Sequence, residues 1–523
     1  MDALQENLLR RATLGDLMTR SALRFGDRVA VVTGQGPVSY KALNARACQA
    51  AHAALKLGIG RGDRVAFMTH NCLDYVCLRL GLAKIGAVPV PLNFALKGEE
   101  IGFIAGNSEA KALFVEDVLA PEVLGVKARL PSVQHYGWFG ITRPGGKPPD
   151  WIDTAGFFKG EYPETEPEVL VESADMASIM YTTGTEGFPK GVMTSHLNYF
   201  MAMLHLAVDV DLGRQDVVIL DLPLFHIAGT TILNASLTFG AKVLLDYAPN
   251  PVNILKKTQE ERITIWFYPP TLFGALPSVP GFSDWDLSSL KKCVTFGAAM
   301  PEVVLERWRA IKPGIEWRNY YGQTESSPLG TTSSPEDFEP ASIGIADTGI
   351  TVKVFDENDR EVPAGTHGEI VMRGPAVMMG YWRNPEATEK TLRGGWLHTG
   401  DIGYQDARGQ FFFVDRKKDM IKTGGENVSS QEVEGMILRH PKVALAAVMG
   451  IPDPHWIEAV AAWVVLKPGQ AATEGEIIAF CKENMAGYKA PKKVIFEKAL
   501  PQTPNGKILK RQIREAYLKQ GAG

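Results

Sequence analysis

The chain has 523 residues, of which 45% are hydrophobic and 22% charged, a balance typical of folded globular proteins. This length exceeds what a single hydrophobic core usually supports, so at least two domains are expected. The formal net charge of −4, from 55 basic and 59 acidic side chains, gives no reason to expect nucleic acid or an anionic membrane as a partner.

Targeting and membrane signals are absent from the sequence pattern. No run approaches the roughly 18 uncharged apolar residues that a membrane-spanning helix needs, so no integral membrane segment is expected. The first twenty or so residues mix acids and bases and lack the apolar block of a signal peptide. The 5 cysteines are scattered without metal-ligand spacing, which favours reduced thiols and a cytoplasmic location.

Helix-like and strand-like patterns alternate along the first part of the chain. Apolar spacing predicts helices over residues 40–59 and 74–87. Buried strands are predicted over residues 63–70, 241–246, 263–270 and 291–301, and a short extended piece with prolines, suited to a sheet edge, over residues 88–93. This alternation predicts a doubly wound α/β fold, in which ligands bind at loops beyond the strand ends.

The pattern changes after about residue 350. Residues 351–374 predict two strands around a charged turn, and a compact mixed segment follows. In that segment we expect helices at residues 429–440 and 474–485 and strands at 443–450 and 458–466. Four consecutive charged residues at 415–418 mark the predicted domain junction.

Residues 181–192 read YTTGTEGFPKGV and combine glycines, hydroxyl side chains and one lysine. Backbone N–H groups of a glycine-rich turn, hydroxyls and a cation are the groups that hold phosphate. A strand-like pattern precedes the stretch, and residues 195–204 predict a helix directly after it. A Walker P-loop is excluded because Pro189 stands where the second glycine belongs. The pattern favours a phosphate-binding loop over a surface loop of small residues.

This loop resembles the phosphate-binding loop of the adenylate-forming enzymes, which include acyl-CoA and aryl-CoA synthetases, luciferases and the adenylation domains of peptide synthetases. It departs from their pattern at Thr183, where the family has serine, and at Glu186, where it has threonine. Further family motifs are matched in the same order at residues 319–326, 395–403, 415–434 and 501–515. Ile457 stands where family members commonly have glycine. The likeness covers essentially the whole chain.

The resemblance implies a fold and a two-step reaction. A large N-terminal domain of doubly wound α/β sheets with a small β-barrel-like subdomain would span residues 1–416, and a small mobile α+β domain residues 417–523, with a hinge at Lys418. A carboxylic acid would attack the α-phosphate of ATP, giving acyl-AMP and pyrophosphate. The acyl group would then pass to the thiol of coenzyme A, with Mg²⁺ as the cofactor.

The resemblance also implies roles for individual residues. Catalysis is assigned to Lys507, which would bridge carboxylate and α-phosphate, with His226 and Glu325; read without the resemblance, Lys507 is one more surface lysine of a basic tail. Mg²⁺ would be bound by Glu325 and Thr185, the pantetheine arm of coenzyme A by Gly424 and Gly425, and the acid by Phe225, His226, Ala228 and Gly229. Lys507 and the remaining matching positions are assigned to ATP or AMP: Thr182, Thr183, Gly184, Thr185, Lys190, Gly297, Ala298, Ala299, Asn319, Tyr320, Tyr321, Gly322, Thr324, Asp401, Arg416 and Lys422.

The predicted acid pocket is apolar. Residues 225–233 and 266–276 contain no aspartate for an amino-acid ammonium group and no arginine or lysine for a second carboxylate. A fatty, alicyclic or aromatic acid is therefore expected. Two alternatives stay open: delivery of the acyl group to a separate acyl carrier protein, and a pseudoenzyme that binds nucleotide without turnover. The expected partners are the acid, ATP and coenzyme A, and a homodimer is a further expectation.

Overall fold

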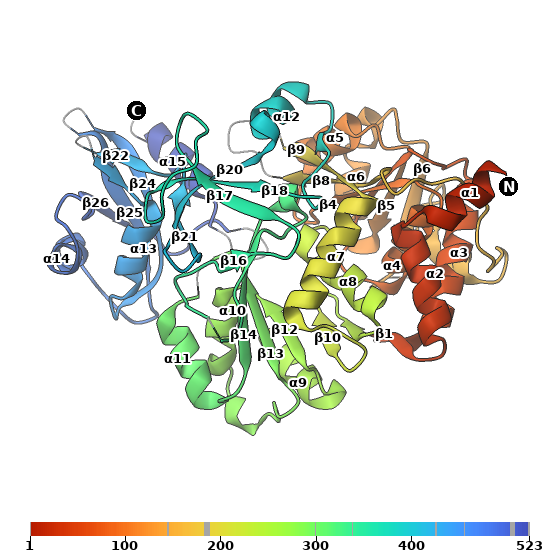
Figure 1. Cartoon of the computed structure of the whole chain (residues 1–523), viewed down its shortest axis with the longest axis horizontal. Coiled ribbons are helices and arrows are strands. Elements are labelled where there is room, and N and C mark those ends of the chain that lie inside the picture. Colours follow the sequence, from red (N-terminus) through yellow and green to blue (C-terminus); the bar gives the residue numbers. More distant parts are fainter. Residues whose placement is uncertain are drawn as a thin grey trace. The chain divides into compact units, whose positions relative to one another are not determined.

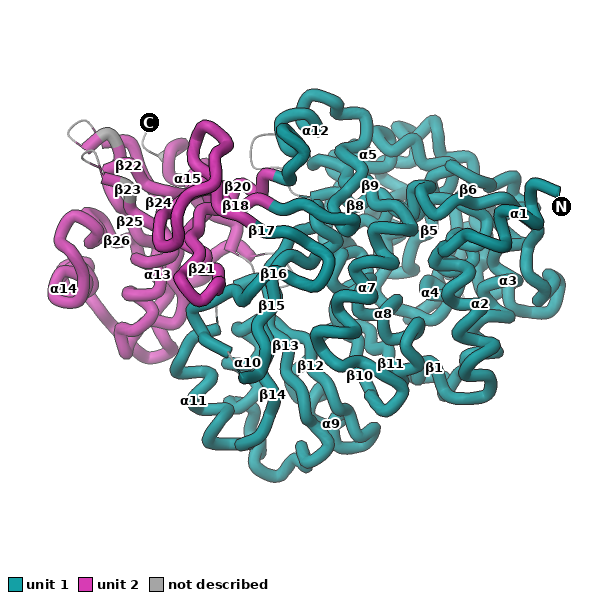
Figure 2. The backbone as a smooth tube through the Cα atoms, in the orientation of Figure 1, with its two compact units in different colours: residues 1–352, 372–397 teal, residues 353–371, 398–523 magenta. Residues whose placement is uncertain are grey.

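The computed structural model describes residues 2–143, 146–182, 189–298, 300–336, 338–423, 426–453, 456–502 and 508–520. The chain groups into two compact units (Figure 2). Unit 1 consists of Met1–Val352 with Met372–Leu397, and unit 2 of Lys353–Val371 with His398–Gly523. The predicted boundary at residue 416 stays a prediction.

Unit 1 contains two large, mainly parallel sheets with helices packed on them (Figure 1). The nine-stranded sheet has the order β16 (Ile345–Ala346), β15 (Thr331–Thr332), β14 (Glu316–Tyr321), β13 (Lys292–Phe296), β12 (Ile265–Tyr268), β10 (Val217–Leu220), β11 (Lys242–Leu245), β1 (Val29–Thr33) and β2 (Gly36–Ser39). The five-stranded sheet has the order β4 (Val88–Leu92), β3 (Arg64–Met68), β5 (Ala112–Glu116), β6 (His135–Phe139) and β7 (Ile152–Asp153), all parallel.

A third sheet in unit 1 is antiparallel and carries the glycine-rich loop. Its order is β19 (Gly380–Tyr381), β9 (Lys190–Ser195) and β8 (Met176–Thr182). The helices of unit 1 are α1 (Ala3–Arg10), α2 (Leu14–Phe25), α3 (Tyr40–Lys56), α4 (Leu73–Lys84), α5 (Gly98–Asn107), α6 (Ala120–Leu124), α7 (His196–Val210), α8 (Ile227–Phe239), α9 (Pro251–Glu261), α10 (Pro270–Ala275), α11 (Glu302–Ile311) and α12 (Pro385–Thr391).

Unit 2 is mixed α and β. It holds most of a four-stranded sheet in the order β17 (Thr351–Phe355), β18 (Gly368–Arg373), β20 (Leu397–Gln405) and β21 (Phe411–Arg416). A second sheet comprises β23 (Glu426–Val428), β22 (Ile421–Thr423), β25 (Ile457–Leu466) and β24 (Val443–Asp453), and β26 (Lys493–Phe496) pairs with β25. Its helices are α13 (Ser430–Leu438), α14 (Glu474–Asn484) and α15 (Lys510–Gln520).

The predicted helices and strands are found with small shifts at their ends. Helix α3 begins after Ser39, whose side chain accepts a hydrogen bond from the Ala42 N–H, a typical N-cap. It ends at Lys56, ahead of Gly58, which has a φ of 72°. Strand β4 with its prolines lies at the end of its sheet, as predicted.

One strand was not predicted. The glycine-rich stretch ends in strand β9, which begins at Lys190 and separates the loop from the helix predicted at residues 195–204, present here as α7. Helix α7 begins only at His196, where the Ser195 side chain caps it by accepting from the Asn198 N–H. The loop therefore joins two antiparallel strands, and phosphate bound there would not lie at a helix N-terminus.

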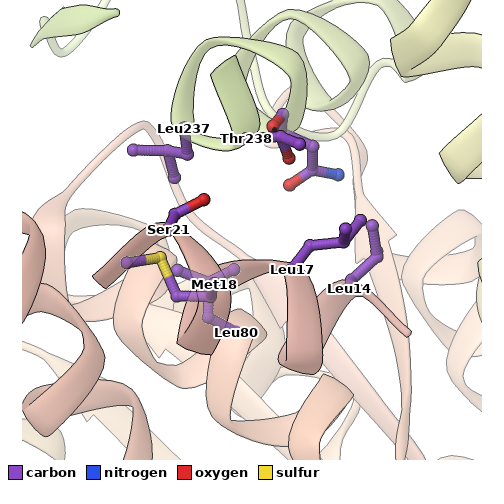
Figure 3. Close-up of a pocket in the computed structure, with 8 residues that line it drawn as sticks. Leu14, Leu17, Met18, Ser21, Leu80, Leu237 and Thr238 are labelled. Carbon is purple, nitrogen blue, oxygen red and sulfur yellow. Dashed lines mark hydrogen bonds between the residues drawn. The ribbon is translucent and has the colours of Figure 1, made fainter. Parts of the chain in front are cut away.

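A small cavity lies in the core of unit 1 between helices α2, α4 and α8 (Figure 3). Its lining is mostly apolar and consists of Leu14, Leu17, Met18, Ser21, Leu80, Asn234, Leu237 and Thr238. None of these residues belongs to the sequence motifs, so this cavity is separate from the predicted acid pocket. Among the described residues, no helix has the length and apolar character required to cross a bilayer.

Candidate active site

The strands on either side of the glycine-rich loop are held in register by direct pairing. Thr182, the last residue of β8, lies opposite Lys190, the first residue of β9. The Thr182 hydroxyl also donates to the Lys190 carbonyl oxygen over 3.5 Å. Thr183, Gly184 and Thr185, predicted to bind phosphate, lie outside the described residues.

Lys190 and Glu325 are connected through one tyrosine, Tyr381. The Lys190 ammonium nitrogen lies 5.0 Å from the centroid of the Tyr381 ring, a cation–π contact. The Tyr381 hydroxyl donates to Glu325 Oε1 over 2.8 Å. Burial, together with the Glu325 carboxylate, raises the pKa of the Tyr381 hydroxyl, which keeps it protonated as a donor. The lysine of the loop and the predicted metal ligand are thus brought together in unit 1.

Glu325 suits a magnesium ligand. Glu325 is 9% exposed and lies in the short 3₁₀ helix Thr324–Ser326. Its neighbour in that helix is Thr324, the predicted α-phosphate contact. Mg²⁺ prefers hard oxygen ligands and usually combines one or two carboxylates with substrate phosphates and water. A single oriented carboxylate at this position fits that requirement.

The ends of β13 and β14 lie side by side because the two strands are parallel, with Asn319 opposite Thr295. Gly297 and Ala298 are exposed directly after β13, where a flat base would meet little obstruction. The next predicted residue, Ala299, lies outside the described residues. Tyr321, the last residue of β14, is half-buried. These ends are consistent with the predicted adenine contacts.

Two predicted nucleotide contacts have buried side chains with other partners. The Asn319 amide donates to the Ser342 carbonyl oxygen over 2.9 Å, and the Tyr320 hydroxyl lies 3.4 Å from Asp209 Oδ2. The backbone of Asn319 is engaged as well, because its N–H donates to Ser333 Oγ over 2.7 Å and its carbonyl oxygen accepts from the Ser333 N–H over 3.0 Å. Gly322 allows its own backbone to approach that of Pro328 closely, because a Cβ at position 322 would lie 1.7 Å from the Pro328 carbonyl oxygen.

The predicted acid-binding residues lie at the start of helix α8. His226 occupies the N-cap position, and its ring centroid is 4.3 Å from that of Phe225. Ala228 is half-buried, and Gly229 is buried. A Cβ at Gly229 would lie 2.7 Å from the Pro223 carbonyl oxygen, so only glycine allows this helix to start so close to the preceding loop.

An acidic side chain, Asp221, lies just before this segment. It is fully buried at the carboxyl end of β10, and its Oδ2 accepts from the Tyr268 hydroxyl over 2.9 Å. Burial raises the pKa of the Asp221 carboxyl to about 7. The 0% exposure of this group keeps it away from a ligand, so it does not alter the apolar character expected for the pocket.

In unit 2 the predicted ribose contacts pair with each other. Asp401 on β20 and Arg416 on β21 are cross-strand partners, and Asp401 Oδ1 lies 3.2 Å from Arg416 Nε. Lys418 is exposed just after β21, and Lys422 is exposed on β22. Gly424, Gly425 and Lys507 lie outside the described residues.

The sequence patterns did not point to Tyr381. It is 56 residues away from Glu325 along the chain, and no local motif connects the two. The sequence offers only a tyrosine directly after Gly380, and this pattern does not identify a site residue unless the fold is known.

Two models of a known protein family match this chain. The family model described as AMP-binding enzyme covers residues 18–382, and the model of the AMP-binding enzyme C-terminal domain covers residues 432–507. The chain belongs to the AMP-binding enzyme family. The predicted membership of the adenylate-forming superfamily, in its acyl-CoA synthetase branch, is thereby confirmed.

Relatives of this AMP-binding enzyme include proteins named for CoA ligation. The long-chain-fatty-acid–CoA ligase FadD13 of Mycobacterium tuberculosis is 35% identical over 92% of this chain and 93% of its own length. A feruloyl-CoA synthase of Amycolatopsis is 34% identical over 97% of this chain and 100% of its own length. The crystal structure of the anthranilate CoA ligase AuaEII with anthranoyl-AMP matches with a TM-score of 0.91 and 29% identity over 98% of both chains. The predicted α/β fold with a large N-terminal and a small C-terminal domain is confirmed.

Proposed function

We propose that this acyl-CoA synthetase activates an apolar carboxylic acid with ATP and transfers the acyl group to coenzyme A. The connection of Lys190 and Glu325 through Tyr381 is the observation that carries the proposal. A cation from the glycine-rich loop and a carboxylate suited to Mg²⁺ are held close together, as a polyphosphate requires. The apolar nature of the acid rests on the uncharged residues 225–233 and 266–276.

In the first step the acid carboxylate attacks the α-phosphorus of ATP. Negative charge accumulates between two anions, so cations placed where that charge develops lower the barrier. Lys190 would bind the phosphates, and Lys507 would bridge the carboxylate and the α-phosphate. Bound Mg²⁺, held by Glu325 with Thr185, would neutralise the polyphosphate. Thr324 would donate a hydrogen bond to a phosphate oxygen, and the Thr182 hydroxyl would do the same in exchange for its long contact with the Lys190 carbonyl oxygen.

The remaining contacts orient the nucleotide and the acid. Asp401 would accept from the ribose hydroxyls, with Arg416 fixing its carboxylate, and Tyr321 would stack on adenine against Gly297 and Ala298. In the second step the thiol of coenzyme A attacks the acyl-AMP carbonyl and AMP leaves. A change in the position of residues 417–523 about Lys418 would replace Lys507 by Gly424 and Gly425 beside the bound acyl-AMP.

Pyrophosphate release across a panel of fatty, alicyclic and aromatic acids, with and without coenzyme A, tests this function. We expect release that depends on an apolar acid, and acyl-CoA formation when coenzyme A is present. Acid-dependent release without acyl-CoA would instead indicate a carrier-protein acceptor. Nucleotide binding without acid-dependent release would contradict both and indicate a pseudoenzyme.

A further inference from the structure

A group of aromatic and acidic side chains lies where strands of both large sheets of unit 1 end. His70 follows β3, Phe94 follows β4, Glu116 is the last residue of β5, and Tyr247 follows β11. These strands are parallel to their neighbours, so the residues meet at carboxyl ends, the edge at which α/β folds bind ligands.

Glu116 is the anchor of this group. Its side chain is 0% exposed, and Oε2 accepts from the His70 backbone N–H and from His70 Nδ1, both over 2.8 Å. The Tyr247 hydroxyl donates to Oε1. A carboxylate removed from water is tolerated only where such donors compensate for its lost hydration. These hydrogen bonds fix the hydrogen of the imidazole on Nδ1 and fix the plane of the ring.

The imidazole held in this way is stacked between two rings. Its centroid lies 3.8 Å from that of Phe94, at an interplanar angle of 21°, and 4.2 Å from that of Tyr247, at 15°. Phe94 meets Phe225 edge to face, with centroids 5.1 Å apart. Phe225 in turn contacts His226. A continuous series of ring contacts therefore leads from His70, which Glu116 holds, to the predicted acid-binding residues.

The side chain of Asn71, the residue after His70, holds the same region by hydrogen bonds to backbone atoms of other loops. The Asn71 amide nitrogen donates to the carbonyl oxygens of Leu222, over 2.9 Å, and Asp246, over 3.1 Å. Its amide oxygen accepts from the Leu224 N–H over 3.0 Å. The turn after β3 is thus attached both to the loop that leads into Phe225 and to the residue before Tyr247.

We propose that His70, held by Glu116 and Tyr247, is a positioning residue that sets Phe94 and, through it, Phe225 and His226, and so determines which acids the enzyme accepts. This inference rests on the proposed function, because it takes Phe225 and His226 to contact the acid. Displacement of Phe94 would change the space beside Phe225, and a pocket discriminates between acids by such differences in fit.

The variant His70→Asn tests the role of the imidazole ring separately from that of its hydrogen bond to Glu116. The asparagine amide can donate to Glu116 in place of Nδ1, so the buried carboxylate keeps a partner while the ring beneath Phe94 is lost. We expect the ratio of kcat/KM between a compact acid and a bulkier one to change about tenfold relative to the unmodified enzyme. The KM for ATP should stay within about twofold, because the nucleotide contacts are untouched.

The matched control is His135→Asn. His135 is the first residue of β6, at the amino end of the same five-stranded sheet, and this variant should keep the original ranking of acids. If His70→Asn does not accumulate as a folded protein, Phe94→Leu removes the next ring in the series and should shift the same ranking.

An active, folded His70→Asn enzyme that keeps the original ranking, or that slows equally with every acid, would overturn the inference. A shifted ranking with unchanged KM for ATP supports it. Failure of the unmodified enzyme to release pyrophosphate with any apolar acid is a different result, since it rejects the proposed function itself.

Discussion

Tyr381 contacts two of the sequence motifs with different parts of one side chain. Its ring lies against Lys190 and its hydroxyl donates to Glu325, so substitution by phenylalanine keeps the first contact and removes the second. A hydrogen bond to a charged group contributes about 1.5–3 kcal/mol. We expect Tyr381→Phe to lower kcat/KM for ATP about tenfold or more and to weaken Mg²⁺-dependent ATP binding measured by calorimetry.

A matched control for this variant is Tyr40→Phe. The Tyr40 hydroxyl donates to the Ala241 carbonyl oxygen over 2.8 Å in the core, so this variant also loses a buried tyrosine hydrogen bond. It should unfold at a lower temperature without changing the Mg²⁺ dependence. Equal Mg²⁺ dependence in both variants would reject the role given to Tyr381.

Asp221 makes stability depend on pH. Its pKa is raised by burial to about 7, whereas an exposed aspartate in the unfolded chain titrates near 4. The folded state therefore holds the proton more tightly, and this group's contribution to stability is lost as the pH rises from about 4 to about 7.

Asp221→Asn should remove this dependence. At pH 8 the variant should be more stable than the unmodified protein, by up to about 4 kcal/mol, and the difference should shrink as the pH falls towards 4. Denaturant unfolding at several pH values measures this. Asp27→Asn, at an exposed side chain, changes the net charge equally and should show no such trend. A difference that stays constant with pH would contradict the assignment.

At the scale of elements, helices α3 and α4 cross at Gly81. A Cβ at this position would lie 2.6 Å from the Ala47 carbonyl oxygen and 2.8 Å from the Ala51 nitrogen, which are backbone atoms that cannot move aside. Overpacking costs about 1–3 kcal/mol, and against α3 backbone atoms we expect it to exceed the gain of about 1 kcal/mol from replacing a helical glycine by alanine.

Gly81→Ala should therefore lower the free energy of unfolding, measured by denaturant titration. Gly102→Ala provides the comparison, since Gly102 lies inside α5 and a Cβ there would meet nothing within 4 Å. That variant should be as stable as the unmodified protein or more so. If both variants behave alike, the close approach at Gly81 does not limit the packing.

The sequence predicts those helices and strands that have a local apolar pattern. The long apolar periodicity of α3 and α4 and the buried runs of β12 and β13 are local signals, and these elements were predicted. Strand β9 was missed because Lys190, Thr194 and Ser195 make it polar, and it is held by pairing with β8 and β19. The partner β19 lies far along the chain and leaves no local pattern, and the partner β8 is joined to β9 by the glycine-rich loop, whose residues conceal the pairing.

The candidate site divides in the same way. Glu325, Asp401 and Arg416 could be assigned because each lies within a short motif. Tyr381 and the ring series from His70 to Phe225 could not, because their contacts join separate loops that only the fold brings together. Resemblance thus pointed to the residues proposed to contact the nucleotide, and the structure was needed to find Tyr381 and the ring series.

At the scale of the whole molecule, the proposed reaction requires Lys507 for the first step and not for the second. Lys507→Ala should reduce acid-dependent pyrophosphate release at least about 100-fold and still convert supplied acyl-AMP and coenzyme A into acyl-CoA. Lys510→Ala is the control, because the Lys510 ammonium group is bound to Ser430 and Glu434 within unit 2. It should lower stability and leave the ratio of the two half-reactions unchanged. Normal acyl-AMP formation by Lys507→Ala would reject the assignment.

Lys190, proposed to bind phosphate, and its neighbour Tyr381 stand on a different sheet of unit 1 from the rings proposed to select the acid. Lys190 and Tyr381 belong to the three-stranded antiparallel sheet, whereas His70, Phe94 and Phe225 follow strands of the two parallel sheets. Because no side chain is shared between the two sets, the enzyme can be re-engineered in a modular way. Variant libraries at the turns after β3, β4 and β10 could change the acid specificity while leaving ATP binding intact.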